Sequence, residues 1–394
     1  MNVLYSKNIM INGDFSEGYI VIENGKIIDI LESFDNDYED FSNDIIMPGF
    51  IDQHIHGWGR GSLFYDNSED SLRKMVEDMA KEGVTGFLAT TTTADLDTII
   101  NSIEYSNSVL SDHNKGAKIL GLHLEGPFIN PEQAGAQNSE YCLKPDIEIF
   151  KKFMEACKFK NQIKLTTIAP ELDGAKELIE FCHKNNIQVS AGRTNATFDQ
   201  MMEAKKWGVG GVTHMYGAMK GMHHRELGTV GAALYDTDFY CEFAKQTGIT
   251  VHHEAFNLAF RIKTSDKIIH TTDCLGNGKQ KEPYYHAKRD VHFIPDGDFL
   301  IERKSDGSWE KRYDLNDYNS LRNIELSYID SVRNLLKHTP MSWGDLAKIT
   351  STNPAKYIGL GDRGEIKIGN YADFTIISKD VDLVATVVEG ERVY

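Results

Sequence analysis

Apolar stretches alternate with amphipathic segments through the middle of the chain. Between residues 45 and 274, eight short stretches rich in β-branched and other apolar residues are separated by polar or helical segments. Segments 71–82, 174–185 and 198–207 repeat apolar residues at the spacing of an amphipathic helix. Strands that alternate with helices are typical of a parallel sheet, so the pattern predicts an α/β fold, a TIM-like (β/α)8 barrel.

The eight expected strands mark where chemistry should lie. They fall within residues 45–56, 83–92, 117–126, 163–171, 187–195, 208–216, 248–255 and 267–274. In a barrel of this type the active site lies at the carboxyl ends of the strands. Polar residues that end these stretches are therefore the first candidates for function.

The two chain ends follow a different pattern, with short strands and turns and no helical segment. Asn24-Gly25 lies between alternating apolar residues and is a hairpin signal. Near the C-terminus, strand pairs break at Gly369-Asn370 and at 389–391. We expect residues 1–45 and 360–394 to form one small β-sandwich domain, and residues 46–359 to form the barrel.

The weakest part of the barrel pattern is residues 276–320, which are rich in polar residues, glycine and aromatics. We expect an excursion with its own hairpin at the edge of the active site, and a solvated loop is the alternative. After it, residues 321–338 and 342–360 predict two helices, the second ending near Gly359.

Composition narrows the class of protein. The 394 residues carry a formal net charge of -17, which argues against binding to a phosphate backbone. The five cysteines are scattered without C-x-x-C spacing, as expected of free thiols in a reducing compartment. The N-terminus lacks signal-peptide features, and no 18-residue apolar run occurs. We expect a cytoplasmic protein that binds neither nucleic acid nor membrane.

Two histidines and a glutamate end the first and third expected strands. His54 and His56 are two residues apart, so alternation along a strand places both imidazoles on one face, a good geometry for metal ligands. Glu125 follows an apolar run, where a carboxylate is awkward in a core but suitable as a ligand. His123, on the same strand face, could be a ligand, a partner of one, or a packing residue.

His214 and Asp273 end the sixth and eighth expected strands. Each alone could be a buried hydrogen-bonding group, but with the histidine pair and Glu125 they form a cluster of acceptors at corresponding strand ends. Such a cluster supports metal-assisted hydrolysis, in which a divalent ion activates water and a carboxylate moves its proton to the leaving nitrogen. Asp273 is our candidate for that carboxylate.

Seven motifs carry a family resemblance that covers nearly the whole chain. The sequence reads MPGFIDQHIHG, LHLEGPFINPEQAGAQ, SAGRTNAT, VTHMYGAM, HHRELGTVGAAL, TTDC and RGEIKIGNYADFTII. In order and spacing these motifs resemble the N-acetylglucosamine-6-phosphate deacetylase family of the amidohydrolase superfamily. The resemblance implies a barrel with a small β-sandwich, usually a homodimer, that cleaves the acetamide of a phosphorylated amino sugar.

The resemblance also implies roles for individual residues. Glu125 and His214 match metal ligands, Asp273 matches the general base and acid, and His54 and His56 match the pair used by members that hold a second metal. Arginine pairs with phosphate through two parallel hydrogen bonds, and one arginine of the family grips the substrate phosphate. That position is Arg225, and the positions that line the sugar are Ala136, Gln137, Gly217 and Ala218.

Arg193 is the main departure from the family, because it replaces a histidine ligand on the fifth strand. A guanidinium has no lone pair for a cation, so the half-site with His214 is incomplete. We expect one divalent metal per chain, held by His54, His56, Glu125 and Asp273, and zinc, iron, manganese and cobalt all suit these ligands. Arg193 would then be a fixed positive charge that pairs with Glu125 or holds a substrate oxyanion.

Other departures concern the pocket. Thr250 stands where the family usually places a substrate-binding histidine, and His252, two residues on, could partly compensate. Gly217 replaces an asparagine, and Asn323-Ile324 replaces a Gly-Ser pair. The leading hypothesis is deacetylation of N-acetylglucosamine 6-phosphate or a close N-acylhexosamine phosphate. The alternatives are an amidohydrolase with a different carbohydrate-derived substrate and a non-catalytic homologue that binds a sugar phosphate.

Overall fold

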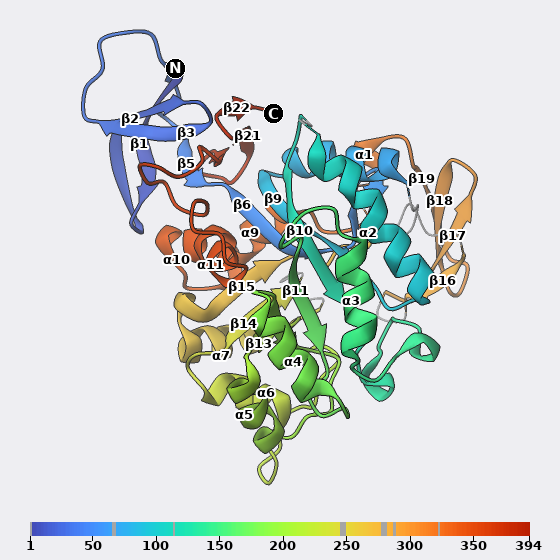
Figure 1. Cartoon of the computed structure of the whole chain (residues 1–394). Coiled ribbons are helices and arrows are strands. Elements are labelled where there is room, and N and C mark those ends of the chain that lie inside the picture. The colour runs from blue at the N-terminus through green and yellow to red at the C-terminus, as the bar shows by residue number, and fades with distance from the viewer. Residues whose placement is uncertain are drawn as a thin grey trace.

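Eight parallel strands form the centre of the computed structural model, which describes residues 2–64, 68–112, 115–244, 250–276, 282–286, 289–321 and 324–394 (Figure 1). In hydrogen-bonded order they are β6 (Phe50–Ile55), β9 (Val84–Thr91), β10 (Lys118–Glu125), β11 (Ile163–Ile168), β12 (Gln188–Ala191), β13 (Val209–Val212), β14 (Tyr240–Ala244) and β15 (Ile268–Thr271). Beyond β15, Asp273 N donates to His54 O at 2.8 Å, which links the last strand to the first. This architecture confirms the predicted barrel.

Helices cover the outside of the barrel (Figure 1). They are α1 (Glu69–Ala80), α2 (Leu96–Ser111), α3 (Ile147–Ala156), α4 (Ala175–Lys184), α5 (Phe198–Trp207), α6 (Gly228–Tyr235), α7 (His253–Lys263) and α9 (Tyr328–His338). The three helices predicted from apolar spacing are present as α1, α4 and α5. A capping box between Thr197 and Gln200 fixes the start of α5, and Gly208, with φ 125°, follows its end. Among the described helices, none combines the length and apolarity needed to cross a membrane.

The last two predicted helices are also present. The first is α9, and the second begins as α10 (Trp343–Ala347), continues through a π-helical turn at Lys348–Thr352, and ends as α11 (Asn353–Tyr357). Gly359 has φ 76°, a left-handed conformation that stops the helix where the sequence predicted. A four-residue helix, α8 (Tyr318–Leu321), precedes α9.

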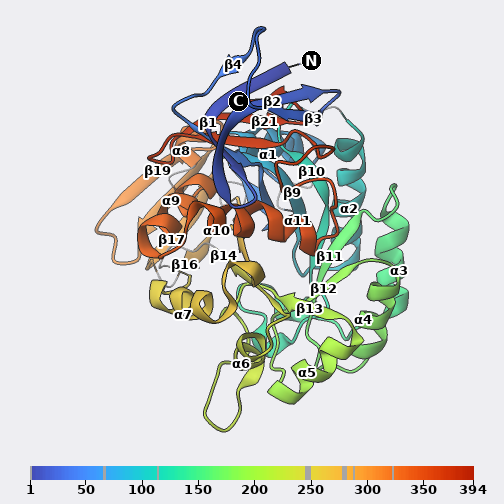
Figure 2. The ribbon, with the colours of Figure 1, turned by 90° about the vertical axis from the view of Figure 1, so that its left-hand side faces the viewer.

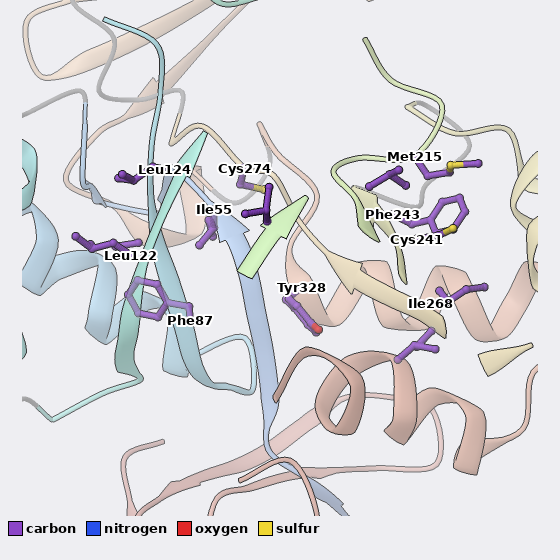
Figure 3. Close-up of a cluster of buried hydrophobic side chains, with 14 of the residues drawn as sticks. Ile55, Phe87, Leu122, Leu124, Met215, Cys241, Phe243, Ile268, Cys274 and Tyr328 are labelled. Carbon is purple, nitrogen blue, oxygen red and sulfur yellow. The ribbon is translucent and has the colours of Figure 1, made fainter. Parts of the chain in front are cut away.

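The barrel core is continuous with the layer beneath the helices. Figure 3 shows side chains from the strands, among them Ile55, Phe87 and Leu122, in one buried cluster that also includes Tyr328 of α9. The Tyr328 ring stacks on Phe50 with centroids 5.3 Å apart. Burial of this apolar surface is the main stabilisation of the barrel and holds the strand ends in fixed positions.

The seventh strand is not where the sequence pattern placed it. The strand is β14, whereas within the predicted range 248–255 residues 248 and 249 lie outside the described residues and α7 begins at His253. All five residues of β14 are buried, and they pair in register with β13 and β15. His252 is the N-cap of α7, since its ring accepts a hydrogen bond from Glu254 N at 3.2 Å. The local alternation at 250–253 is therefore the entry to a helix.

The chain ends form one sheet of eight strands. They are β1 (Asn2–Ile11), β2 (Asp14–Glu23), β3 (Lys26–Leu31), β4 (Glu39–Asp40), β5 (Ile45–Pro48), β20 (Phe374–Ile377), β21 (Leu383–Val388) and β22 (Glu391–Arg392). β5 pairs antiparallel with β20, and the sheet packs on its own apolar cluster. Figure 2 shows both chain ends at this sheet. A separate domain built from both termini is thus confirmed, whereas its boundaries at 45 and 360 stay predictions.

Two local predictions for this sheet have different outcomes. Asn24 and Gly25, with φ of 50° and 76°, form the predicted hairpin between β2 and β3. The strand pair expected across Gly369-Asn370 is wrong. Gly369 N donates to Ile27 O at 2.8 Å and Ile27 N donates to Asn370 O at 2.9 Å, so this segment bonds to β3 instead of to itself.

The excursion after β15 is larger than one hairpin. It forms a four-stranded antiparallel sheet of β16 (Tyr284–His286), β17 (Val291–Asp296), β18 (Phe299–Lys304) and β19 (Glu310–Asp314). Phe293, Leu300 and Tyr313 build its apolar core. Two further strands of two residues each, β7 (Gly57–Trp58) and β8 (Gly61–Ser62), follow β6 and pair antiparallel with each other.

Candidate metal and catalytic site

The carboxyl ends of β6, β10 and β15 bring four predicted site residues together. Ligand atoms of His54, His56 and Glu125 lie within 4.8 Å of one another, and all three side chains are buried. The Nε2 atom of His56 is 3.3 Å from Glu125 Oε2 and 3.3 Å from Asp273 Oδ1. The Nε2 atom of His54 is 3.6 Å and 3.4 Å from the same two oxygens. The predicted histidine pair therefore shares one face with two carboxylates.

This group of side chains has the features of a cation site. His54 Nε2 is buried and has no hydrogen-bond partner among the described residues. A buried nitrogen that faces two carboxylate oxygens needs a proton or a cation between them. Imidazole nitrogen and carboxylate oxygen are the usual donors to zinc and related divalent ions. The residues present fit a divalent metal.

Glu242 on β14 orients His54, and it is not among the residues predicted from the sequence. Its buried Oε1 lies 2.8 Å from His54 Nδ1, and its Oε2 accepts from Gln53 Nε2 at 2.7 Å. Because an ionised carboxylate only accepts, His54 carries its hydrogen on Nδ1 and presents Nε2 to the cluster. The signal was the acid within the apolar run YCEFA, but the seventh strand was assigned to a later segment.

Glu125 has a different set of neighbours at each carboxylate oxygen. Oε1 accepts from Arg193 Nε at 2.7 Å and lies 2.9 Å from His214 Nε2. Oε2 faces the histidine pair and accepts from Gln137 Nε2. Burial opposes ionisation, but the charges of Arg193 and His54 hold the pKa of Glu125 well below its usual range. Glu125 is therefore a carboxylate that joins two half-sites.

Arg193 follows β12 and pairs with Glu125, one of the two roles expected for it. Only 8% of the residue is exposed, and Nη1 donates to Ala134 O. Its own carbonyl accepts from Asn130 N at 3.0 Å. The guanidinium is thus held on one side by Glu125 and on the other by the segment that follows β10.

Asp273 is ionised and reaches solvent. Its side chain is 24% exposed. Burial opposes its charge, but the neighbouring His54 and His56 hold the pKa of the Asp273 carboxyl below its usual range. An ionised carboxylate at the edge of the cluster can accept a proton, as a general base requires.

Strained backbone occurs at three of these strand ends. Arg193, His214 and Asp273 have φ of 48°, 34° and 50°, in the left-handed region that residues other than glycine seldom adopt. Such strain persists where the surrounding structure enforces it, and it is concentrated at functional sites.

A cavity of about 360 Å³ opens beside the cluster. Most of its wall is made of small or apolar side chains, with few polar groups. The wall includes the predicted residues Ala136, Gly217, Ala218 and Thr250, together with Arg193, His214 and Asp273. A small polar molecule that enters it meets the ionised Asp273 and the guanidinium at once.

Several predicted site residues lie elsewhere. Gln137 contacts Glu125 and is not part of the cavity wall. Arg225 is exposed, and its Nε donates to His224 Nε2 at 3.1 Å. His252, expected on a strand, is the exposed cap of α7 described above. Asn323 lies outside the described residues.

His123 is a packing partner of His54. Its Nε2 is 2.8 Å from Thr167 Oγ1, and its ring meets the His54 ring edge to face with centroids 4.6 Å apart. Burial and the nearby His54 lower the pKa of His123 to about 3, so its ring stays neutral. Among the roles left open by the sequence, the structure supports packing against His54, a candidate ligand.

Comparison with known proteins agrees with this geometry. Residues 45–393 match the amidohydrolase family. The chain is 34% identical to the N-acetylglucosamine-6-phosphate deacetylase of Bacillus subtilis (strain 168), over 96% of this chain and 93% of that protein. It is 33% identical to the enzyme of that name from Lysinibacillus sphaericus, over 89% of this chain and 85% of that protein.

The fold comparison gives the same result. The crystal structure of N-acetylglucosamine-6-phosphate deacetylase from Thermotoga maritima superposes with a TM-score of 0.80 at 28% identity. The match covers 100% of this chain and 99% of that chain. Together with the motifs and the strand-end cluster, these matches confirm that the chain belongs to the amidohydrolase family.

Proposed function

We propose that this amidohydrolase hydrolyses the acetamide of N-acetylglucosamine 6-phosphate, or of a close N-acylhexosamine phosphate, to give acetate and the amino sugar phosphate. The observation that carries the proposal is the position of the Asp273 carboxylate, whose Oδ1 lies 3.3 Å from His56 Nε2 and which also lines the cavity. The names and identities of the relatives support the substrate class.

The proposed metal site uses one half of the cluster. His54, His56, Glu125 and Asp273 would hold one divalent cation per chain, either zinc, iron, manganese or cobalt. When bound, such an ion lowers the pKa of water and polarises a carbonyl oxygen. A second ion between Glu125 Oε1 and His214 would meet the guanidinium of Arg193, which repels it.

The protein's own groups supply the proton transfers. Asp273 takes a proton from the attacking water as the water oxygen bonds to the amide carbon. The carbon–nitrogen bond then breaks, and Asp273 gives the proton to the leaving amine, which restores the carboxylate. Glu242 keeps His54 in one tautomer and one orientation throughout. Arg225 stays our candidate for the substrate phosphate.

A changed substrate is the second candidate, because two departures from the family lie on the cavity wall. They are Thr250 and Gly217. A Cβ on residue 217 would lie 3.1 Å from His214 O, a tight contact that requires the His214 carbonyl to give way slightly if an asparagine stands there. This supports a pocket shaped for a different N-acyl sugar, with the same hydrolytic chemistry.

The test is a purified protein, its metal content and the release of free amine. The substrates are the 6-phosphates of N-acetylglucosamine, N-acetylgalactosamine and N-acetylmannosamine, with unphosphorylated N-acetylglucosamine as the control. We expect about one metal per chain and fastest release from N-acetylglucosamine 6-phosphate. Release only from another sugar would favour the second candidate, and no release from metal-loaded protein would favour a non-catalytic binding protein. The dimer and the cytoplasmic location stay predictions, tested by light scattering and by cell fractionation.

A further inference from the structure

One nitrogen of the Arg193 guanidinium has no acceptor within the described part of the chain. Nε donates to Glu125 Oε1 at 2.7 Å, and Nη1 donates to Ala134 O. Nη2 has no such contact, yet it is not one of the buried polar atoms that lack a partner. Arg193 lines the cavity, and Nη2 is the guanidinium nitrogen that its protein contacts leave for a molecule bound there.

The position of this donor is fixed before any substrate arrives. Arg193 is tied to the 130–135 segment twice, through Nη1 to Ala134 O and through its carbonyl, which accepts from Asn130 N at 3.0 Å. Gly135 leaves room for it, since a Cβ there would lie 2.8 Å from Nη1. A donor held in this way needs no reorganisation during a reaction, which is the condition for strong electrostatic stabilisation.

The donor also lies at the reacting end of the cavity. Glu125 links Arg193 to the histidine pair, because its Oε1 contacts Arg193 Nε and its Oε2 is 3.3 Å from His56 Nε2. Asp273, the proposed base, lines the same cavity. A substrate amide close enough to Asp273 to react therefore has its carbonyl oxygen near a permanent positive charge.

Amide hydrolysis places negative charge on that oxygen. When water adds to the carbonyl carbon, the carbonyl π electrons move to oxygen and form a tetrahedral oxyanion. The pair returns to re-form the carbonyl when the amine leaves. Charge-assisted hydrogen bonds from arginine to such an oxygen are short and strong. Arg193 is the one arginine or lysine on the described cavity wall.

We propose that Arg193 is a catalytic residue of this chain, which donates through Nη2 to the carbonyl oxygen of the substrate amide and stabilises the oxyanion. The proposal rests on the proposed function. Arg193 stands where the family resemblance implies a metal ligand. The proposal gives Arg193 a direct part in the reaction, in addition to its ion pair with Glu125.

The test compares Arg193→Gln with the wild type in four measurements. These are metal content, kcat, KM, and affinity for two ligands, a phosphonamidate that mimics the tetrahedral intermediate and the product glucosamine 6-phosphate. Glutamine can still donate to Glu125 but has neither the charge nor Nη2. We expect kcat to fall by about 10²–10³-fold with full metal content and a nearly unchanged KM. Affinity for the phosphonamidate should fall by a similar factor, while affinity for the product stays the same.

Two further variants separate catalysis from folding. Arg193→Ala should regain part of its kcat when guanidinium is added, because the free cation can occupy the vacated position. Arg363→Gln removes another nearly buried guanidinium, which pairs with Asp373 and Glu389 in the terminal domain, and should leave phosphonamidate affinity unchanged.

Three outcomes would overturn the proposal. The first is an Arg193→Gln protein with unchanged kcat. The second is loss of metal in proportion to kcat, which would leave Arg193 a structural role only. The third is equal loss of affinity for the phosphonamidate and the product. A wild-type protein that holds metal but releases no amine from any of the sugar phosphates would instead overturn the proposed function, and the role of Arg193 with it.

Discussion

The two oxygens of Glu125 face half-sites of opposite character. On the Oε2 side, His54, His56 and Asp273 present acceptors, and one buried nitrogen lacks a partner. On the Oε1 side, Arg193 presents a permanent donor beside His214. Glu125 Oε2 therefore faces a candidate site for a metal cation, whereas Oε1 faces the guanidinium cation of Arg193.

This difference shows how one residue changes the metal content expected of a site. Two unit charges about 4 Å apart interact by roughly 4 kcal/mol at an effective dielectric constant of about 20, and a divalent ion doubles this. In the proposed site Arg193 would thus repel a second ion, and it stands where the family resemblance implies one of that ion's ligands. On the side of Glu125 Oε2 the groups still suit a cation. Glu242 orients the His54 ring there, and Asp273 adds a second carboxylate.

The largest effect is expected from Asp273→Asn, on the acceptor side. An amide cannot take the proton from water, so we expect kcat to fall by about 10³-fold or more. Metal content, measured by elemental analysis after loading with excess metal, should stay near one per chain, because His54, His56 and Glu125 remain. Asp273→Glu keeps a carboxylate and should retain more activity than Asp273→Asn. Wild-type turnover by a folded, metal-loaded Asp273→Asn protein would remove this residue from the mechanism.

Glu242→Gln should weaken metal binding without removing a ligand. The substitution allows His54 to adopt the other tautomer, so affinity measured by competition with a chelator should fall by about 10–100-fold. Glu302→Gln is the matched control, because Glu302 is also fully buried but lies in the four-stranded sheet and contacts Tyr313. Equal metal affinity for wild type and Glu242→Gln would show that Glu242 does not orient the ligand.

His270 is a buried barrel histidine without a proposed role as a metal ligand, and it affects how stability depends on pH. Both ring nitrogens are buried without partners among the described residues, and burial lowers the pKa of His270 to about 3. Because the unfolded chain takes up this proton near pH 6.5, the contribution of His270 to stability is complete above that pH and is lost as the pH falls toward 3. Between pH 7.5 and pH 5 the loss is about 2 kcal/mol.

The measurement is denaturant unfolding of wild type and His270→Leu at both pH values. The variant should lose about 2 kcal/mol less on acidification than the wild type. His183→Leu, at an exposed histidine, is the control for the loss of one histidine. Identical pH dependence in wild type and His270→Leu would contradict a depressed pKa at this residue.

The smallest change is expected in metal stoichiometry. Arg193→His restores an imidazole beside Glu125 Oε1 and His214, so metal content should rise from about one to about two per chain. Elemental analysis after removal of loosely bound ions measures this change. A variant that still holds one metal would show that the guanidinium is not what excludes the second. Two tightly held metals in the wild type would show that Arg193 does not exclude a second ion.

Short-range patterns in the sequence were sufficient for part of the site. The spacing of His54 and His56 fixed their common face, because side chains alternate along any strand. The positions of Glu125 and Asp273 followed from their place at the ends of apolar runs. The limits of α5 were equally local, since a capping box begins the helix and a glycine follows it.

Which apolar run forms the seventh strand was decided only in three dimensions. Both 240–244 and 248–255 carry strand-like patterns, but among the residues that the structure describes it is 240–244 that pairs with β13 and β15. This choice brought Glu242 to His54, 188 residues away in sequence. Arg193 and Glu125 are 68 residues apart. The sequence determined which side chains stand at the strand ends, because that depends on neighbouring residues. Which donor meets which acceptor was left to tertiary structure, because that depends on strand pairing between distant segments.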